Sequence, residues 1–243
     1  WTAYAKTDVY PAGHEWAVKI WDMYGGCEFT YITNKCGEYH NECDCYNREH
    51  SIPKSWFGGA ESQAGADLFH IVPTDGKVNG MRSNYAFGEV NSTSYSYNGS
   101  KLGTAKSVTV TNTMLGASKT ASCSGTVFEP IDEYKGDFAR MYMGSMVRWA
   151  GDYQAFTSGD GAKIFSGTYT EVGKYGLTEY GIALLMKWHR QDPVSDKERA
   201  RNNGIQQTQG NRNPFIDYPE LVEYIWGDSI AKTSFDLSMT KIN

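Results

Sequence analysis

The stretch at residues 46–84 constrains the fold more than any other part of the chain. Residues 46–50 (YNREH) alternate as a short β-strand, and Pro53 ends regular pairing soon afterwards. Residues 66–73 predict a second strand. A turn signal follows, and residues 77–84 then open a helix. The sequence therefore predicts a β-β-α unit.

Polar side chains of an unusual combination fall within this unit. The carboxylate of Glu49 stands beside the imidazole of His50, and a second histidine, His70, lies in the next predicted strand. Asn79 stands in the predicted helix. A base, hard oxygen ligands and nearby cations are the parts that metal-assisted phosphoryl chemistry needs. Because Glu49 and His50 point to opposite sides of a strand, a shared site needs a twist or bend at the strand end.

Each of these side chains also has an ordinary structural interpretation. Taken alone, Glu49 is more often a solvated strand carboxylate, and His50 a half-buried imidazole with a hydrogen bond. Asn79 is equally a helix cap or a turn residue, because asparagine favours both positions. His70, inside its strand, is more typical of a core histidine than of a base.

Composition limits the protein class. The 243 residues include 28 acidic and 23 basic ones, so the net charge is −5. Proteins that bind phosphates electrostatically are usually basic. The net negative charge therefore argues against a broadly cationic nucleic-acid-binding surface but allows a local cationic groove. No apolar run reaches the roughly 18 residues of a membrane span. No signal peptide and no initiator Met are visible, so we expect a mature or trimmed product.

Four of the five cysteines lie within residues 27–45, and the fifth is Cys123. Dense cysteines predict disulfides formed in an oxidising compartment, although the sequence leaves their connectivity open. An alternative is a zinc site, which would be formed by Cys36, His40, Cys43 and Cys45. The single residue between the last two of these cysteines is shorter than the usual zinc-ligand spacing.

The rest of the chain predicts an α+β protein of one domain, with long loops and several helices towards the C-terminus. Residues 85–127 are rich in Ser, Thr, Gly and Asn and read mainly as loops. Further strands are predicted at residues 18–24, 27–32 and 107–111. Helices are predicted from Glu129-Pro130 to Trp149, over 177–190, after the capping box at Ser195, and over 221–226 with a cap from Asp217 and Pro219.

Five separated blocks, in order, resemble the endonuclease I family, secreted or periplasmic nucleases with a ββα-metal (His-Me finger) core. The blocks are NREHSIPKSWF at 47–57, HIVP with VNGMRSN at 70–84, FEP with GDFAR at 128–140, WHRQDPV at 188–194 and QGNRNPF at 209–215. Several blocks in one order are a specific signal, whereas a lone Glu-His pair would be weak.

The resemblance implies a single endonuclease I-like domain over residues 1–243, with a ββα-metal core at about 44–90 and a small mixed or antiparallel sheet. It implies that His50 is a general base and that Glu49 and Asn79 are catalytic residues that bind one Mg²⁺, for which Mn²⁺ or Ca²⁺ can substitute. His70 would support the site. The implied activity is non-specific hydrolysis of DNA, and also of RNA, to 5′-phosphate ends. We expect a secreted or periplasmic monomer without membrane association.

One departure from the family concerns the phosphate clamp. Family members place an arginine between the catalytic histidine and the second histidine block, but residues 51–69 contain no Arg and only Lys54. The candidates for phosphate contact are Lys54, Arg82, Asn84, Arg201 and Arg212. Arg82 and Asn84 could instead anchor the helix to loops. The helix after Ser195 could be either a solvated face or a cationic wall along the nucleic-acid backbone.

Two competing classes remain from the sequence. A catalytically weak or inactive extracellular module that binds nucleic acid or a partner protein is favoured by the acidic balance and the missing arginine. The intact set of Glu49, His50 and Asn79 argues against it, because a pure binding module does not need all three. A zinc-dependent hydrolase is disfavoured, since the sequence has no H-x-x-x-H pattern.

Overall fold

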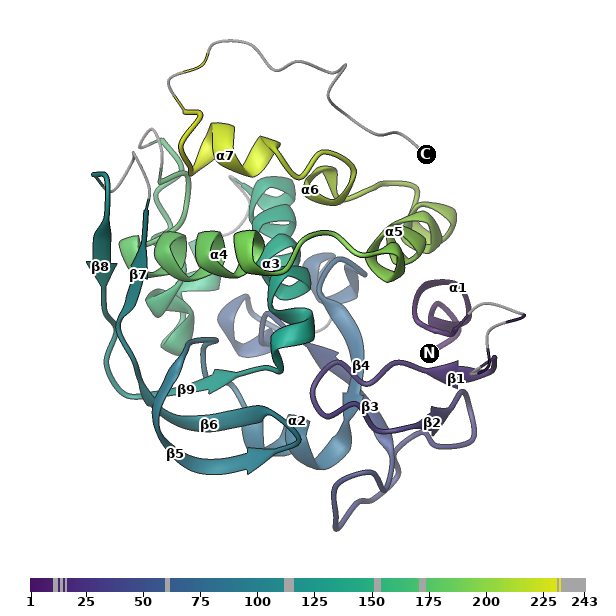
Figure 1. The fold of residues 1–243 in the computed structure, drawn as a ribbon. Coiled ribbons are helices and arrows are strands. Elements are labelled where there is room, and N and C mark those ends of the chain that lie inside the picture. Colours follow the sequence, from purple (N-terminus) through teal and green to yellow (C-terminus); the bar gives the residue numbers. More distant parts are fainter. Residues whose placement is uncertain are drawn as a thin grey trace.

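The predicted β-β-α unit is present and lies in the lower middle of the view in Figure 1. The computed structural model describes residues 1–10, 17–59, 62–111, 116–150, 154–170 and 174–230, with the single residues 13, 15 and 232. Strand β3 (Tyr46–His50) pairs antiparallel with β4 (Ile71–Asp75), and helix α2 (Gly76–Arg82) follows β4 directly. The first predicted strand and the helix of the unit are thus confirmed.

The second strand of the unit begins later than residues 66–73 predict. Residues Ala64–Ala66 form a 3₁₀ turn (η2), and His70 lies just before β4 rather than inside it. Helix α2 begins at Gly76, after the side chain of Asp75 accepts a hydrogen bond from the Val78 N–H at 2.8 Å. Asp75 is therefore the N-cap, which leaves Asn79 in the middle of the helix.

Two disulfides fix the chain ahead of β3, between Cys27 and Cys43 and between Cys36 and Cys45. The zinc alternative is wrong, because all three of its thiols are in disulfides, and no group of three or more metal-ligating side chains occurs among the described residues. A Cβ at Gly76 would lie 2.5 Å from Cys36 Sγ, so the second disulfide packs against the start of α2. Cys123 is a free, half-buried thiol.

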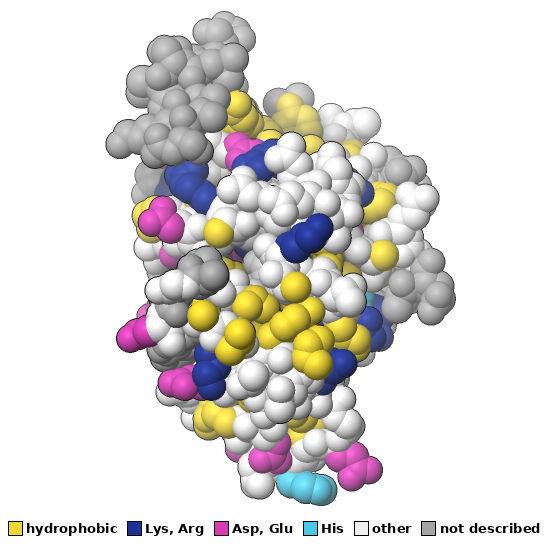
Figure 2. Space-filling model, turned by 90° about the vertical axis from the view of Figure 1, so that its right-hand side faces the viewer, with side chains coloured by type: hydrophobic (Ala, Val, Ile, Leu, Met, Phe, Trp, Pro, Cys, Tyr) yellow, Lys and Arg dark blue, Asp and Glu magenta, His cyan; other side chains and the backbone are white. Residues whose placement is uncertain are grey.

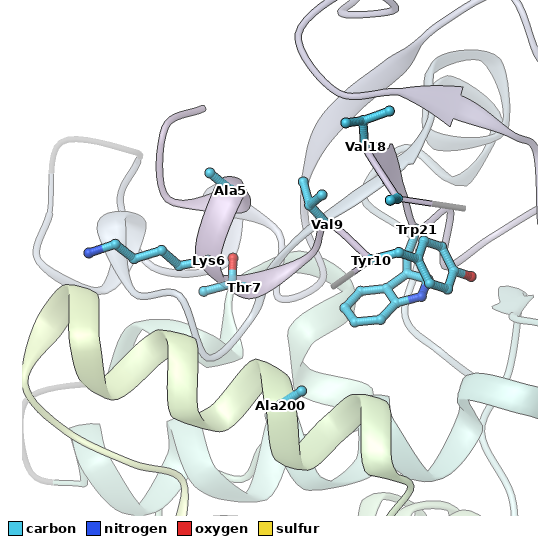
Figure 3. Close-up of a pocket in the computed structure, with 9 residues that line it drawn as sticks. Ala5, Lys6, Thr7, Val9, Tyr10, Val18, Trp21 and Ala200 are labelled. Carbon is cyan, nitrogen blue, oxygen red and sulfur yellow. The ribbon is translucent and has the colours of Figure 1, made fainter. Parts of the chain in front are cut away.

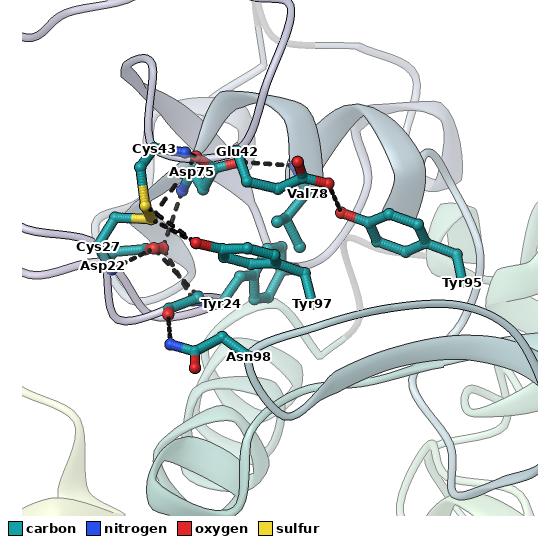
Figure 4. Close-up of a disulfide and its surroundings, with 11 residues drawn as sticks. Asp22, Tyr24, Cys27, Glu42, Cys43, Asp75, Val78, Tyr95, Tyr97 and Asn98 are labelled. Carbon is teal, nitrogen blue, oxygen red and sulfur yellow. Dashed lines mark hydrogen bonds between the residues drawn. A yellow bond between two sulfur atoms is a disulfide. The ribbon is translucent and has the colours of Figure 1, made fainter.

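The first disulfide lies beside the carboxylates of Asp22 and Asp75 (Figure 4). Asp22 is buried and accepts hydrogen bonds of 2.8–3.1 Å from four backbone N–H groups, those of Tyr24, Gly25, Cys27 and Asp75. These bonds form a turn after residue 21, so the strand predicted at 18–24 is observed only as the shorter β1 (Lys19–Ile20). Its partner, predicted at 27–32, shrinks to β2 (Phe29–Thr30).

The region of residues 85–127 contains more sheet than predicted. Strands β5 (Val90–Tyr97) and β6 (Ser100–Ala105) form a hairpin, and β9 (Thr126–Glu129) pairs with β6. The turn residues Asn98 and Gly99 both have positive φ, which is the local signal for a two-residue hairpin. The strand predicted at 107–111 is confirmed as β7 (Val108–Val110), paired with β8 (Lys119–Ala121).

The helices form the remaining part of the fold. They are α1 (Tyr4–Thr7), α3 (Lys135–Trp149), α4 (Glu179–Gln191), α5 (Asp196–Gln209), α6 (Pro214–Asp217) and α7 (Leu221–Ile225), with short 3₁₀ turns η1 (Lys54–Trp56), η3 (Asp132–Tyr134), η4 (Gln154–Thr157) and η5 (Gly159–Lys163). None of these described helices is long and apolar enough to cross a membrane. The predicted α+β class is confirmed.

Helix boundaries depart from the prediction in two places. Glu129 ends strand β9, and α3 begins only at Lys135. Asp217 ends α6 instead of capping the last helix, because its carboxylate pairs with Arg212 at 2.6 Å. Ser195 is confirmed as the N-cap of α5, where it accepts a hydrogen bond from the Glu198 N–H.

The main core lies between α3, α4 and the three-stranded sheet. Phe87, Phe128, Phe138, Tyr142 and Trp188 are fully buried there, and their rings lie 4.9–6.3 Å from the ring of Phe87. Aromatic rings at such distances add to the stability that burial provides. The hydroxyl of Tyr142 reaches past this core to donate to the carbonyl of Ser51, which ties the core to the end of β3.

Candidate active site

A polar hollow of about 270 Å³ lies where the end of β3 meets α2. It is lined by Asn47, Arg48, Glu49, His50, Pro53, Lys54, Asn79, Arg82, Ser83 and Asn84. The structure thus brings together most of the side chains that the sequence singled out. Glu49 and His50 both line the hollow although they alternate along β3, and His50 is the last residue of that strand.

Glu49 is a buried carboxylate held by two donors. The hydroxyl of Tyr24 donates to its Oε1 at 2.7 Å, and Nη1 of Arg82 donates to the same oxygen at 2.6 Å. Burial raises the pKa of Glu49, and the positive charge of Arg82 opposes this rise. Both side-chain hydrogen bonds fall on Oε1, so Oε2 is the oxygen that remains for a ligand in the hollow.

Arg82 makes internal contacts that join α2 to the end of β3. Its guanidinium is only 1% exposed and also donates to the carbonyl oxygens of His50, at 3.1 Å, and of Ser51, at 2.7 Å. The sequence left open whether Arg82 anchors the helix or contacts phosphate. In this structure its Nη1 and Nη2 groups donate to Glu49 and to the backbone, which orients the carboxylate.

Two consecutive carbonyl groups of η2 hold the two histidines. Nε2 of His50 donates to the carbonyl oxygen of Gly65 at 2.9 Å, and Nε2 of His70 donates to that of Ala64 at 2.7 Å. A carbonyl oxygen can only accept, so each Nε2 carries the proton, and Nδ1 of His50 remains as the basic nitrogen. The two rings lie 5.8 Å apart, and His70 is fully buried.

Both imidazoles are neutral at pH 7. Burial, and after it the neighbouring His70, lower the pKa of His50 to about 4, against a smaller opposing effect of the Gly65 carbonyl. Burial also lowers the pKa of His70. A general base must be unprotonated at its working pH, which His50 satisfies.

Asn79 is a half-buried residue of α2 that lines the same hollow as Glu49. Its side chain makes no hydrogen bond to any other residue that the structure describes, because Asp75 takes the capping role. A carboxylate oxygen and an amide oxygen in one hollow are hard donors. Two such ligands fit Mg²⁺, which prefers oxygen and keeps several of its waters.

Two exposed cations, Lys54 and Arg48, line the hollow. The sequence singled out Lys54 but not Arg48, whose guanidinium lies 4.9 Å from the ring centroid of Trp1. The strand alternation that puts Arg48 on the same side as His50 was the available signal. Asn84, also exposed, lines the hollow as well.

Arg201 and Arg212 do not line the hollow. Arg201 is 1% exposed, pairs with Asp8 at 2.9 Å and donates to the carbonyls of Leu68 and Ile71. Arg212 pairs with Asp217. Within α5, Glu198, Arg201 and Asn202 are buried whereas Asn203, Gln206 and Gln207 are exposed, so the helix is neither a wholly solvated face nor an open cationic wall.

A different kind of hollow, of about 440 Å³, lies between α1, β1 and α5 (Figure 3). Its lining is mostly apolar and includes Val9, Val18 and Trp21. Figure 2 shows hydrophobic side chains gathered in the middle of the face on this side of the molecule, with Lys and Arg side chains around them. This hollow holds no carboxylate and no histidine among its described lining residues, whereas the β3-α2 hollow holds both.

The fold and the site define a disulfide-bonded α+β protein whose acid–histidine pair ends one strand of a β-β-α unit. Comparison with known proteins identifies the family. The endonuclease I family matches residues 1–220, and the chain belongs to that family.

Two curated relatives are similar to the chain. One is the extracellular ribonuclease of Bacillus amyloliquefaciens, 30% identical over 230 residues, which cover 93% of this chain and 66% of the relative. The other is the extracellular ribonuclease of Bacillus subtilis (strain 168), 36% identical over 190 residues, which cover 74% of this chain and 54% of the relative. The chain therefore spans between about half and two thirds of the length of these relatives.

Proposed function

We propose that this protein is an extracytoplasmic endonuclease that hydrolyses phosphodiester bonds of DNA and RNA with little sequence preference and leaves 5′-phosphate ends. The observation that carries the proposal is the shared hollow of Glu49, His50 and Asn79, in which the Gly65 carbonyl leaves Nδ1 of His50 free to take a proton. Membership of the endonuclease I family and the names of the two relatives support the nucleic-acid substrate. The two disulfides support an oxidising compartment.

The proposed step is hydrolysis with His50 as the general base. Nδ1 of His50 takes a proton from a water molecule, whose oxygen forms a bond to phosphorus. The bond between phosphorus and the 3′ oxygen breaks, and that oxygen gains a proton from solvent. The carbonyl of Gly65 holds the imidazole in place, and its acceptance of the Nε2–H stabilises the imidazolium that forms.

Glu49 and Asn79 would hold one Mg²⁺, with Mn²⁺ or Ca²⁺ as substitutes. Such an ion, when bound, offsets negative charge on the phosphate and on the departing oxygen. Arg82 and Tyr24 orient the Glu49 carboxylate for this role. The exposed cations Lys54 and Arg48, which line the hollow, would bind the phosphate in place of the arginine that the family carries further along the chain. Contacts made mainly to phosphate and sugar account for low sequence preference.

The test is plasmid DNA and a structured RNA, each incubated with the wild type and with His50→Ala in Mg²⁺ or in EDTA. We expect nicking and degradation only by the wild type and only in Mg²⁺. His40→Ala is the matched control, since His40 is exposed in the disulfide loop, and it should cleave normally. A wild type that leaves both nucleic acids intact in Mg²⁺, Mn²⁺ and Ca²⁺ would instead support a non-catalytic binding module.

A further inference from the structure

The catalytic hollow, called the first hollow below, adjoins another hollow of about 360 Å³ on the side of η5, called the second hollow. The second hollow is lined by Ser55, Trp56, Ser83, Asn84, Tyr85, Ser158, Gly159 and Asp160. Ser83 and Asn84 line both hollows, so the two share a wall. A nucleic acid held with one phosphate in the first hollow must continue to its neighbouring nucleotide, and the second hollow lies beside that path.

The charges of the two hollows differ. The first contains the cations Arg48 and Lys54, whereas the lining of the second contains no cation among its described residues. Among the lining residues that the structure describes, the charged one is Asp160, whose carboxylate pairs with Lys163 at 2.9 Å. A phosphate gains nothing at such a site. An uncharged group with hydrogen-bonding edges is favoured, such as the sugar and base of a nucleotide.

Tyr85 supplies an aromatic surface in this hollow. Its side chain is 37% exposed, and among the described residues no ring stacks on it and none forms a hydrogen bond with its hydroxyl. Bases stack on exposed aromatic rings with little regard to sequence, because every base has a π-face. The hydroxyls of Ser55, Ser83 and Ser158, all exposed, are available to the sugar.

We infer that the hollow beside Tyr85 is a subsite for the nucleoside next to the scissile phosphate, in which the base stacks on Tyr85 and the sugar contacts the serine hydroxyls. This inference rests on the proposed function for the identity of the ligand. It adds a residue that positions the substrate and a reason for sequence tolerance, since stacking contributes affinity without reading the base.

The test is the binding of two single strands of about eight nucleotides, within the roughly 4–16 nucleotides that one OB-fold, a common single-strand-binding fold, covers. One strand is ordinary DNA, and the other has the same backbone without bases. Binding is measured by fluorescence anisotropy in EDTA, in the His50→Ala background and again with the otherwise native protein. We expect Tyr85→Ala to weaken binding of the ordinary strand by about tenfold and to leave the abasic strand unchanged.

Two further variants serve as controls. Tyr85→Phe should bind both strands as the parent does, because stacking needs only the ring. Met81→Ala should also have no effect, since Met81 is equally exposed on α2 but lines neither hollow. The inference is overturned if Tyr85→Ala weakens both strands alike or neither, or if the parent does not bind the ordinary strand. A base-dependent loss at Tyr85 in a wild type that cleaves no nucleic acid would overturn the proposed hydrolysis and keep the subsite.

Discussion

At the scale of single residues, long-range partners orient the functional side chains. Gly65 and Ala64 present consecutive carbonyls to His50 and His70, which fixes both tautomers. Glu49 receives its two donors from Tyr24 and Arg82, which lie 25 and 33 residues away in the sequence. The adjacency of Glu49 and His50 was visible in the sequence, but the partners that hold them were not.

The lowered pKa of His50 predicts a dependence of stability on pH. The folded protein takes up the His50 proton only near pH 4, whereas the unfolded chain does so near the ordinary value of 6.5. Between these values the unfolded state binds more protons, so stability falls as pH falls. We expect His50→Gln to lose less unfolding free energy than the wild type between pH 6.5 and pH 4, measured by urea denaturation. His40→Gln should behave as the wild type, and equal losses in all three would contradict the assignment.

Removal of the Arg82 guanidinium should be strongly destabilising. Arg82→Met leaves the Glu49 carboxylate buried without its counter-charge, which costs about 3–5 kcal/mol in comparable buried pairs. Urea denaturation at neutral pH would measure this loss. The double variant Arg82→Met with Glu49→Gln should recover part of it, because the uncompensated charge is gone. No recovery would mean that the lost packing and backbone bonds, and not the charge, dominate.

At the scale of elements, helix α2 is the part on which the site depends. Asp75 caps it, and the same carboxylate accepts a hydrogen bond from the Cys43 N–H at 2.7 Å, beside the first disulfide. The buried carboxylate of Asp22 accepts in turn from the N–H of Asp75. The loop with the disulfides, the end of β4 and the start of α2 are thus one connected structure, and the positions of Asn79 and Arg82 follow from it.

The effect of removing the N-cap of α2 can be distinguished from the effect of removing the N-cap of another helix. Asp75→Ala should cost about 1 kcal/mol for the lost cap and about 1–3 kcal/mol more for the unpaired Cys43 N–H. Because α2 carries Asn79, plasmid nicking should also fall at a temperature where the variant is folded. Ser195→Ala removes the equivalent cap of α5, and we expect it to cost about 1 kcal/mol without loss of nicking. Equal nicking by the two variants would show that the site tolerates a shifted α2.

The elements also show where local patterns succeed. Strand 46–50, the helix after Asp75 and the helix after Ser195 follow their local signals. The strand predicted at 18–24 failed because Asp22 takes four backbone N–H groups that a sheet would use. The residues Asn98-Gly99 are a sequence signal for the turn of the β5–β6 hairpin. The serine- and threonine-rich composition around them obscured this signal, so the hairpin was not predicted.

At the scale of the whole molecule, the buried arginines are held in internal ion pairs. Arg140 binds both oxygens of Glu198, at 2.7 and 2.6 Å, and joins α3 to α5. Arg201 joins α5 to Asp8, and Arg82 is bonded to Glu49. Such buried arginines support the scaffold of an acidic protein and are not available to a substrate.

This distribution predicts a weak dependence of nucleic-acid binding on salt. Two cations, Arg48 and Lys54, line the hollow, and each neutralised phosphate contributes about −0.9 to the slope of log affinity against log salt. We therefore expect a slope of about −2 for duplex DNA bound by His50→Ala. Anisotropy titrations over a range of NaCl would measure it. A slope several times steeper would require a cationic surface outside this hollow.

The sequence by itself determined the order of the β-β-α unit, the adjacency of Glu49 and His50, and the blocks that place the chain in the endonuclease I family. These depend on side-chain alternation, turn residues and local motifs, which neighbours in the sequence encode. Only the tertiary structure decided the disulfide pairing, the burial of Arg82 and Arg201, and the hollow beside Tyr85. Each of these depends on which distant segments pack together, because burial and long-range hydrogen bonds exist only once the chain has folded.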